Sequence, residues 1–225
     1  MVTIVSLGWN ENDLTNSFLE RLKRYTDIPH SLIFTDNGSA EPMAPIVKKY
    51  YPQHESIVIT KKQNVGCPAT RNEAMKYVET DICFWLDNDC MVGPNWYQPI
   101  LDKLEDDSIG ISGVQGYEVK YPFELPYPFE AVIDGDCDYF MGWLMGFKTQ
   151  YYKPINDYKI PVNLDDVECC WGIKSNGKRA VVSEPCFAKH LVSATKRGWE
   201  FNDQVKLKEL WNNWGDKSIF NRYRI

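Results

Sequence analysis

Short apolar runs alternate with segments of helical spacing along the first part of the chain. Runs rich in β-branched and aromatic residues, which favour strands, cover residues 2–7, 31–34, 57–59 and 82–86. Between the first two runs, Leu14, Phe18 and Leu22 are spaced as on one face of a helix, and further helices are expected at residues 44–50 and 68–77. Strands that alternate with helices connect by right-handed crossovers. The pattern therefore predicts an α/β fold with a mostly parallel central sheet flanked by helices.

Two carboxylates follow the last of these predicted strands directly, in Asp87-Asn88-Asp89. Ligands of α/β sheets bind beyond the carboxyl ends of the strands, and acids one residue apart in an extended segment point the same way. Asp87 and Asp89 can therefore hold a divalent cation, Mn²⁺ or Mg²⁺, that keeps coordination positions open for substrate phosphates. The alternative is a solvated turn, because an Asp-x-Asp string by itself is common.

Further short motifs occur in a fixed order along the chain. Together with the acidic string, they make the chain resemble the nucleotide-sugar-dependent glycosyltransferases of the GT-A fold, particularly glycosyltransferase family two. The resemblance implies a Rossmann-like GT-A catalytic domain at residues 1–190, and residues 191–225 are expected to form a C-terminal helical extension. The motifs are Gly8-Trp9-Asn10-Glu11, Asp36-Asn37-Gly38-Ser39, Asn64-Val65-Gly66, Ala69-Thr70-Arg71-Asn72-Glu73-Ala74, Leu86-Asp87-Asn88-Asp89 and Leu164-Asp165-Asp166-Val167-Glu168.

The resemblance implies how the metal would be held. Asp89, the last acid of its motif, is expected to coordinate the cation directly, and Asp87 to contact the ribose or to reach the metal through water. His190 follows the strand-like residues 184–187, where members of this fold often place a histidine that completes the metal site. Neutral imidazole is acceptable to manganese beside carboxylates. The alternative for His190 is a histidine with a structural role.

The resemblance also implies which residues bind the donor, a nucleoside diphosphate sugar that we expect to be uridine-linked. Asp36 is expected to accept hydrogen bonds from the nucleotide base. Arg71 lies early in a predicted helix whose free N–H groups face an anionic diphosphate; the alternative is an ordinary pair with Glu73 or Asp81. The full set of expected donor-binding residues is Leu7, Gly8, Trp9, Asp36, Asn64, Gly66, Arg71, Asp87 and Asn88.

An inverting transfer needs a carboxylate that removes the proton of the acceptor hydroxyl. By resemblance Asp166 takes this position, and Asp165 stands where the family usually has Glu and supports it. The alternative is that these acids only stabilise a helix N-terminus. Glu168, Tyr139 and Trp143 are the expected acceptor-binding residues, although the two aromatic rings can equally form a hydrophobic cover over the sheet. A proline-rich stretch, in which Tyr-Pro-Phe-Glu occurs at residues 121–124 and again at 127–130, predicts an ordered loop.

Composition narrows the class of protein. A chain of 225 residues without a Ser/Gly/Pro-rich linker is expected to be a single soluble domain with its extension. No apolar run is long enough to span a bilayer and no signal-peptide pattern opens the chain, so membrane-embedded synthases are not expected. The seven cysteines show no zinc spacing and do not pair evenly, which favours a reducing, cytoplasmic location.

Charge leaves the identity of the acceptor open. The net charge is −6, but residues 189–225 carry eight Lys or Arg against four Asp or Glu. This basic tail is the only hint of the alternative acceptor, a hydroxylated nucleic-acid base, whereas a carbohydrate, a glycoconjugate or another hydroxyl compound is favoured. A nucleotidyltransferase is disfavoured because the first strand lacks a Gly-rich loop with a lysine after it. A non-catalytic nucleotide-sugar-binding module would have no reason to keep Asp89, Asp166 and His190 together.

Overall fold

The computed structural model of the protein describes residues 1–119, 129–155, 164–183 and 186–191. Two of the predicted features therefore fall largely outside it. The expected C-terminal extension lies outside the described residues except for residue 191, and so does the proline-rich loop up to residue 128.

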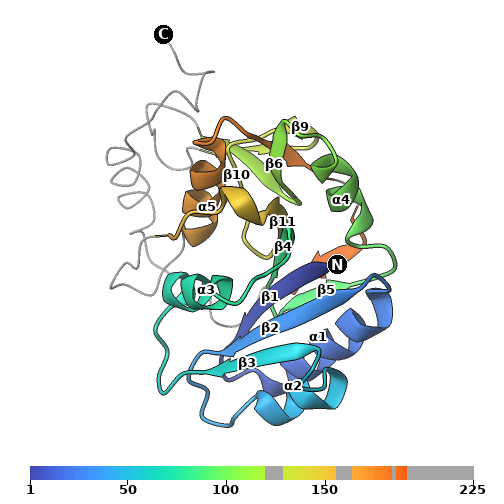
Figure 1. Ribbon diagram of the computed structural model, residues 1–225, viewed down its shortest axis with the longest axis vertical. Helices are drawn as coiled ribbons and strands as arrows, with labels where there is room; N and C mark the ends of the chain where they lie inside the picture. The colour runs from blue at the N-terminus through green and yellow to red at the C-terminus, as the bar shows by residue number, and fades with distance from the viewer. Residues whose placement is uncertain (120–128, 156–163, 184–185, 192–225) are drawn as a thin grey trace.

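The predicted α/β architecture with a mostly parallel central sheet is confirmed. An eight-stranded sheet is formed, in spatial order, by β3 (Ser56–Thr60), β2 (His30–Asp36), β1 (Val2–Gly8), β4 (Ile82–Leu86), β11 (Leu144–Lys148), β6 (Ile109–Gly113), β12 (Arg179–Val182) and β9 (Gly135–Asp136) (Figure 1). The first four strands in this order are parallel to one another. The β11 strand is antiparallel to both of its neighbours, β4 and β6, and β12 is parallel to β6. The carboxyl ends of β1, β2 and β4 consequently lie at one edge of the sheet.

Two smaller sheets lie beside the main one. The first is formed by β10 (Tyr139–Phe140), β7 (Gly116–Val119) and β8 (Phe129–Val132), and the second by β13 (Ala188–His190) and β5 (Cys90–Val92). The expectation of a strand before His190, at residues 184–187, is wrong for 186 and 187, and residues 184–185 lie outside the described part. Pairing with the three-residue β5 sets the limits, because its register places Ala188 opposite Val92 and His190 opposite Cys90.

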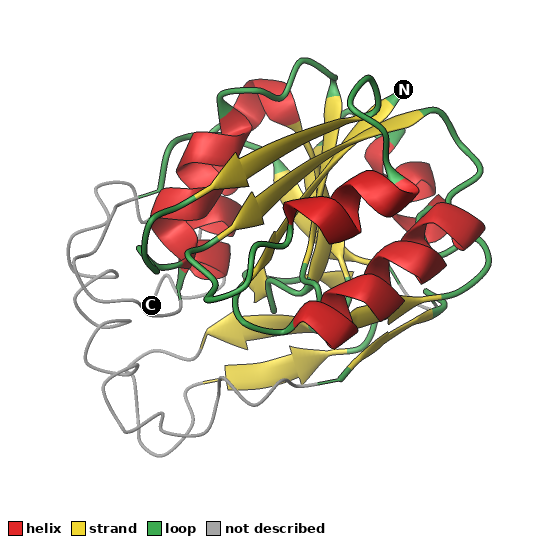
Figure 2. Cartoon of the chain, turned by 90° about the horizontal axis from the view of Figure 1, so that it is seen from below, coloured by secondary structure: helices red, strands yellow, loops and turns green. Residues whose placement is uncertain are grey.

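Helices cover both faces of the main sheet, as Figure 2 shows. Side chains of α1 (Asn12–Tyr25), α2 (Ala44–Tyr50) and α4 (Gln98–Leu104) share one apolar cluster, and side chains of α3 (Cys67–Met75) and α5 (Asp165–Lys174) share another. Strand alternation divides the sheet between them: Leu32 and Phe34 belong to the first cluster and Ile33 to the second. A short 3-10 helix, η1 (Thr149–Tyr151), follows β11.

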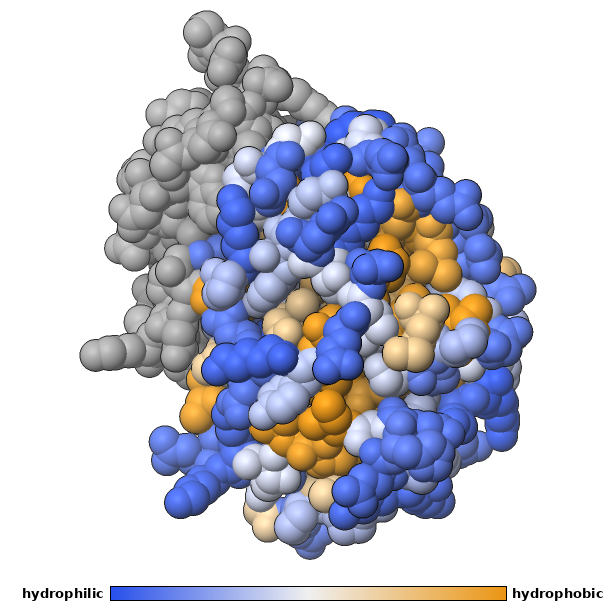
Figure 3. Space-filling view, viewed as in Figure 1, coloured by the Kyte–Doolittle hydropathy of each residue, from blue (hydrophilic) through white to orange (hydrophobic). Residues whose placement is uncertain are grey.

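The surface is mainly polar on the face drawn in Figure 3, where hydrophobic residues show as patches among hydrophilic ones. Within the described ranges, no helix has both the length and the apolar character that a membrane crossing requires. None of the seven cysteines forms a disulfide. Cys83 lies buried in β4, and Cys169 and Cys170 lie buried in α5, as the sequence predicts.

Candidate active site

Asp87, Asp89 and His190 meet at the end of β4, although the histidine is about a hundred positions away in the chain. One ligand atom from each of the three side chains lies within 4.8 Å of the others. Nε2 of His190 is 3.1 Å from Oδ1 of Asp89. The pairing of β13 with β5 produces this arrangement, since β5 begins directly after Asp89, and the backbone N–H of Leu191 donates to the carbonyl of Asp89 at 2.9 Å.

The donor set of this cluster fits a divalent cation. Two carboxylates and one imidazole are acceptable to Mn²⁺, whereas Mg²⁺ favours oxygen ligands. Asp89 is buried, with 6% of its surface exposed. Burial raises the pKa of Asp87 to about 6, although the guanidinium of Arg71 acts in the opposite direction. A bound cation would favour the ionised carboxylates, because metal ligands must be deprotonated.

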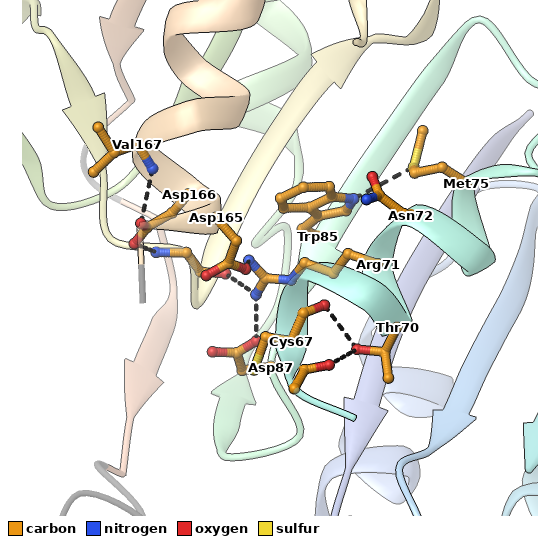
Figure 4. A network of polar contacts seen from close by, with 12 residues as sticks. Cys67, Thr70, Arg71, Asn72, Met75, Trp85, Asp87, Asp165, Asp166 and Val167 are labelled. Atoms are coloured by element: carbon orange, nitrogen blue, oxygen red, sulfur yellow. Dashed lines mark hydrogen bonds and ion pairs between the residues drawn. The ribbon is translucent and has the colours of Figure 1, made fainter. Parts of the chain in front are cut away.

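Arg71, on α3, connects this cluster to the acids of α5. Its Nη1 pairs with Asp165, and its Nη2 donates to Oδ1 of Asp87 at 2.9 Å and to the carbonyl of Gly142 at 3.1 Å. Figure 4 shows the guanidinium between the two carboxylates, beside the ring of Trp85. The guanidinium carbon lies 4.4 Å from the centroid of that ring, within the range of a cation–π contact. One buried arginine therefore neutralises an acid from each of two distant segments.

The alternative pairing for Arg71, with Glu73 or Asp81, is wrong. Glu73 pairs with Lys61 instead. The expected contact of Arg71 with the donor diphosphate stays a prediction. In this structure both of its terminal nitrogens donate to protein groups.

Asp166 occupies the first turn of α5 and is held by two backbone amides. Its Oδ2 accepts from the N–H of Gly142 at 3.0 Å, and its Oδ1 accepts from the N–H of Val167 at 2.8 Å. Leu164, directly before the helix, has φ 95, a left-handed conformation that is a genuine outlier for a bulky residue. Strain of this kind clusters at functional sites, where the surrounding structure holds it in place.

The electrostatic surroundings of Asp166 suit a group that exchanges protons. Burial, and then the neighbouring charge of Asp165, raise the pKa of Asp166 to about 7. Arg71 and the two backbone hydrogen bonds act against this rise. A carboxylate that titrates near neutral pH can take a proton from an acceptor and release it again.

Gly142 was not singled out in the sequence, yet it joins these groups. Its carbonyl accepts from Arg71 and its N–H donates to Asp166. A Cβ at this position would lie 2.9 Å from Nη1 of Arg71 and 3.0 Å from Cβ of Asp166, so only glycine fits without displacement. No pattern in the sequence distinguishes this glycine from the others, because the need for it arises from two side chains that are remote in the chain.

Asp36 is fully buried at the end of β2. Its Oδ1 accepts from the N–H of Ser39 at 2.9 Å and its Oδ2 accepts from the N–H of Met43 at 3.0 Å. Both oxygens thus close the turn that follows β2. The expected contact with the nucleotide base stays a prediction, and the geometry shows a structural role for this carboxylate.

Gly8 and Asn88 lie against each other where β1 and β4 end. A Cβ on Gly8 would lie 3.0 Å from Nδ2 of Asn88 and 2.8 Å from the sulfur of Met43. Asn88 donates through this Nδ2 to Oγ1 of Thr15 in α1 at 2.9 Å. The middle residue of the acidic string therefore fastens that turn to a helix. Of the other expected pocket residues, Leu7 is half-buried and Trp9 is exposed.

Asn64 and Gly66 lie before α3 and are tied to β2 through Asn37. Oδ1 of Asn64 accepts from Nδ2 of Asn37 at 3.0 Å and from the N–H of Gly66 at 2.9 Å. Oδ1 of Asn37 in turn accepts from the N–H of Val65 at 3.0 Å. The sequence assigned no role to Asn37 beyond its place in a motif, although a side-chain amide can both donate and accept and so can form such a cross-link.

The expected acceptor-binding residues are all buried. Tyr139 stacks on Tyr117 with ring centroids 5.5 Å apart, and Trp143 stacks on His190 with centroids 5.2 Å apart. Glu168 lies in α5 with 6% of its surface exposed. This packing favours the alternative of a hydrophobic cover for the two aromatic residues, and their contact with an acceptor stays a prediction.

The family model described as Glycosyl transferase family 2 matches residues 3–176. The hyaluronan synthase of Pasteurella multocida is 31% identical over 94 residues, which are 41% of this chain and 10% of that protein. The chain thus spans about a tenth of the length of this curated relative.

Several solved structures share the fold. TarS 1-349 of S. aureus in complex with UDP-GlcNAc has a TM-score of 0.68 at 14% identity, over 93% of this chain and 64% of that one. The mannosyltransferase PcManGT from Pyrobaculum calidifontis, in complex with GDP-Man and Mn²⁺, has a TM-score of 0.62 at 16% identity, over 82% and 57%. GalNAc-T7 with UDP, GalNAc and Mn²⁺ has a TM-score of 0.65 at 12% identity, over 84% and 43%. At these identities the likeness shows the fold alone.

Proposed function

The chain belongs to glycosyl transferase family 2, and we propose on this premise that it transfers a sugar from a nucleoside diphosphate sugar to an acceptor hydroxyl, with inversion at the anomeric carbon. The observation that carries the proposal is the bridge that Arg71 forms between Asp87 and Asp165. The bridge neutralises one acid of each pair. In the proposal Asp89, beside His190, is the carboxylate that binds the cation, and Asp166 is the carboxylate that accepts the proton of the acceptor hydroxyl.

The donor that we propose is uridine-linked. Support comes from the bound molecules named for two structural relatives, UDP-GlcNAc for TarS and UDP for GalNAc-T7, whereas PcManGT holds GDP-Man. The donor would lie across the carboxyl ends of β1, β2 and β4, where ligands of such sheets bind. Asn64 and Gly66 shape the loop before α3, whose N-terminal amides favour an anionic diphosphate.

Asp87, Asp89 and His190 are the residues that we propose hold Mn²⁺. When bound, the cation acts as a Lewis acid that stabilises the charge of the departing diphosphate. The names of two relatives include Mn²⁺, which supports manganese over magnesium. The imidazole in the cluster supports the same choice.

Asp166 is the proposed base. The acceptor oxygen attacks the anomeric carbon, the bond from that carbon to the diphosphate oxygen breaks, and the hydroxyl proton passes to the Asp166 carboxylate. A single displacement of this kind inverts the anomeric configuration. Asp165 assists by keeping Arg71 in place and by its charge, which helps to raise the pKa of Asp166.

A thermal-shift experiment tests donor and metal together without an acceptor, because a ligand of the native state raises its apparent stability by mass action. Wild-type protein, Asp89→Ala, His190→Ala and the control Asp134→Ala are heated with UDP, UDP-sugars and GDP-mannose, each with and without MnCl₂. Asp134 is a suitable control since its side chain is 86% exposed and lies outside the cluster.

We expect UDP-sugars to raise the melting temperature of the wild type and of Asp134→Ala only when Mn²⁺ is present. Asp89→Ala should lose this manganese-dependent rise, and His190→Ala should keep part of it. Equal rises in Asp89→Ala and wild type would rule out the metal assignment. A larger rise with GDP-mannose than with any UDP-sugar would rule out the uridine-linked donor.

A further inference from the structure

Trp143 contacts two of the proposed metal ligands, His190 and Asp87. Its indole ring lies flat on the imidazole of His190, with ring centroids 5.2 Å apart and an interplanar angle of 2°. Its carbonyl oxygen accepts from the backbone N–H of Asp87 at 3.0 Å. The side chain is 8% exposed. A residue that the sequence assigned to the acceptor is therefore buried against the metal ligands.

We propose that Trp143 is a positioning residue for His190, which fixes the imidazole plane so that Nε2 faces Asp89 and the bound cation. The inference rests on the proposed function, since it assumes that His190 is a metal ligand. A metal-binding histidine usually donates its second ring N–H to a fixed acceptor, and this bond orients the ring. Within residues 1–119, 129–155, 164–183 and 186–191, Nδ1 of His190 makes no such hydrogen bond. The flat contact with Trp143 takes its place.

Trp143 can serve as a fixed surface because its own ring is anchored. The indole Nε1 donates to Oε1 of Gln115 at 2.7 Å, and Nε2 of Gln115 donates to the hydroxyl of Tyr117 at 2.9 Å. Gln115 has φ 56, an uncommon left-handed conformation for a residue other than glycine. Its carbonyl also accepts from the N–H of Met141 at 3.2 Å. Rotation of the indole would break the first of these bonds.

The stack also orients the side chain of His190, which strand pairing alone does not. The backbone of His190 is fixed by its pairing with Cys90, but this pairing leaves the side-chain torsions free. Stacking on Trp143 limits these torsions before the cation arrives. A coordinating side chain that is already held in place loses less conformational entropy when the metal binds. Loss of the aromatic face should therefore weaken metal binding, although every ligand atom is still present.

The test compares Mn²⁺ affinities of Trp143→Leu, Trp143→Phe and wild type, measured as free Mn²⁺ by EPR at constant UDP. Removal of a residue that orients a metal ligand typically lowers the metal affinity by about 10- to 100-fold. We expect about a tenfold loss in Trp143→Leu and a smaller one in Trp143→Phe, which keeps a flat aromatic face. All variants keep the carbonyl that binds Asp87.

Trp96→Leu is the matched control. Trp96 is also a buried tryptophan of the same apolar cluster, and its Nε1 also donates a hydrogen bond, to Oγ1 of Thr26 at 3.0 Å. Its ring contacts Phe84 and Tyr97 edge-on and touches no proposed metal ligand. Its Mn²⁺ affinity should equal that of the wild type.

His190→Ala, alone and combined with Trp143→Leu, separates the possible results. If Trp143 acts through His190, Trp143→Leu should lower the Mn²⁺ affinity of the wild-type protein and should not lower it further in His190→Ala. An equal loss in both backgrounds would overturn the inference. Unchanged affinity in Trp143→Leu, with a loss in His190→Ala, would overturn the inference and leave the metal assignment intact. Unchanged affinity in His190→Ala would overturn both.

NMR of the His190 imidazole gives a readout that does not depend on the metal or on the folding of Trp143→Leu. Protons above an indole face are shifted upfield by its ring current, so the wild-type signals, assigned by their loss in His190→Ala, should lie upfield of free histidine. They should move little in Trp143→Phe. Signals at the positions of free histidine in the wild-type protein would show that the stack does not persist in solution and would overturn the inference.

Discussion

The strand-end acids Asp87 and Asp89 and the helix-start acids Asp165 and Asp166 have the same side chains but different surroundings. Arg71 forms an ion pair with one acid of each pair, Asp87 in the first and Asp165 in the second. Asp89 has His190 as its neighbour, whereas Asp166 is held by backbone amides. Environment, and not residue type, therefore divides the proposed roles: a carboxylate suits a cation in one place and a proton in the other.

Replacement of Arg71 should have the largest effect, because it breaks both pairs at once. Arg71→Met removes the guanidinium with which Asp87 and Asp165 both pair. Loss of one partner of a buried ion pair costs about 3–5 kcal/mol of stability. Urea unfolding monitored by circular dichroism measures this loss. Arg24→Met is the control, since Arg24 forms an exposed pair with Glu20 on one helix; such pairs contribute about 0.3–0.5 kcal/mol. Similar losses in the two variants would show that Arg71 does not hold the acids together.

Asp166→Asn is the next largest test, and it addresses catalysis alone. The amide keeps the size of the side chain but does not accept the hydroxyl proton, so turnover should fall by about a factor of 100 to 10,000. Donor affinity should barely change, because Asp166 lies outside the proposed metal cluster. Release of nucleoside diphosphate gives the turnover, and the thermal shift with donor gives the affinity. Asp165→Asn should lower turnover less.

Near wild-type turnover in Asp166→Asn would instead point to Asp165 or Glu168 as the base, or to a retaining mechanism. The anomeric configuration of the product, determined by NMR, would then decide between the mechanisms. A single displacement assisted by a base inverts that centre.

The smallest expected effect is a displacement of the pH profile. A base acts only when it is ionised, so kcat/KM should rise with pH, reach half of its plateau near pH 7 and level off above that, in line with the pKa of about 7 for Asp166. The charge of Asp165 contributes to this high pKa. Asp165→Asn removes that negative charge, lowers the pKa of Asp166 and should move the rising limb to lower pH. Profiles measured at saturating Mn²⁺ test this, and a displacement to higher pH would contradict the assignment.

Local pattern was sufficient for the fold and for part of the site. The short apolar runs at residues 31–34 and 82–86 predicted strands, and the structure has β2 and β4 there. Asp87 and Asp89 follow β4 as expected, because a strand end is encoded by adjacent residues. Asp165 and Asp166 were identified by resemblance to the family's motif, and the structure places both in the first turn of α5.

Tertiary structure alone decided how these pieces meet. Arg71 and Asp165 are separated by 94 positions, and neither carries a local signal that names the other. The stacking of Trp143 on His190 and the place of Gly142 between Arg71 and Asp166 arise in the same way. Asp36, whose motif suggested a ligand contact, uses both oxygens within its own turn. Local sequence sets backbone conformation and burial, but the partner of a buried charge depends on which strands become neighbours, and that is fixed only when the whole sheet has formed.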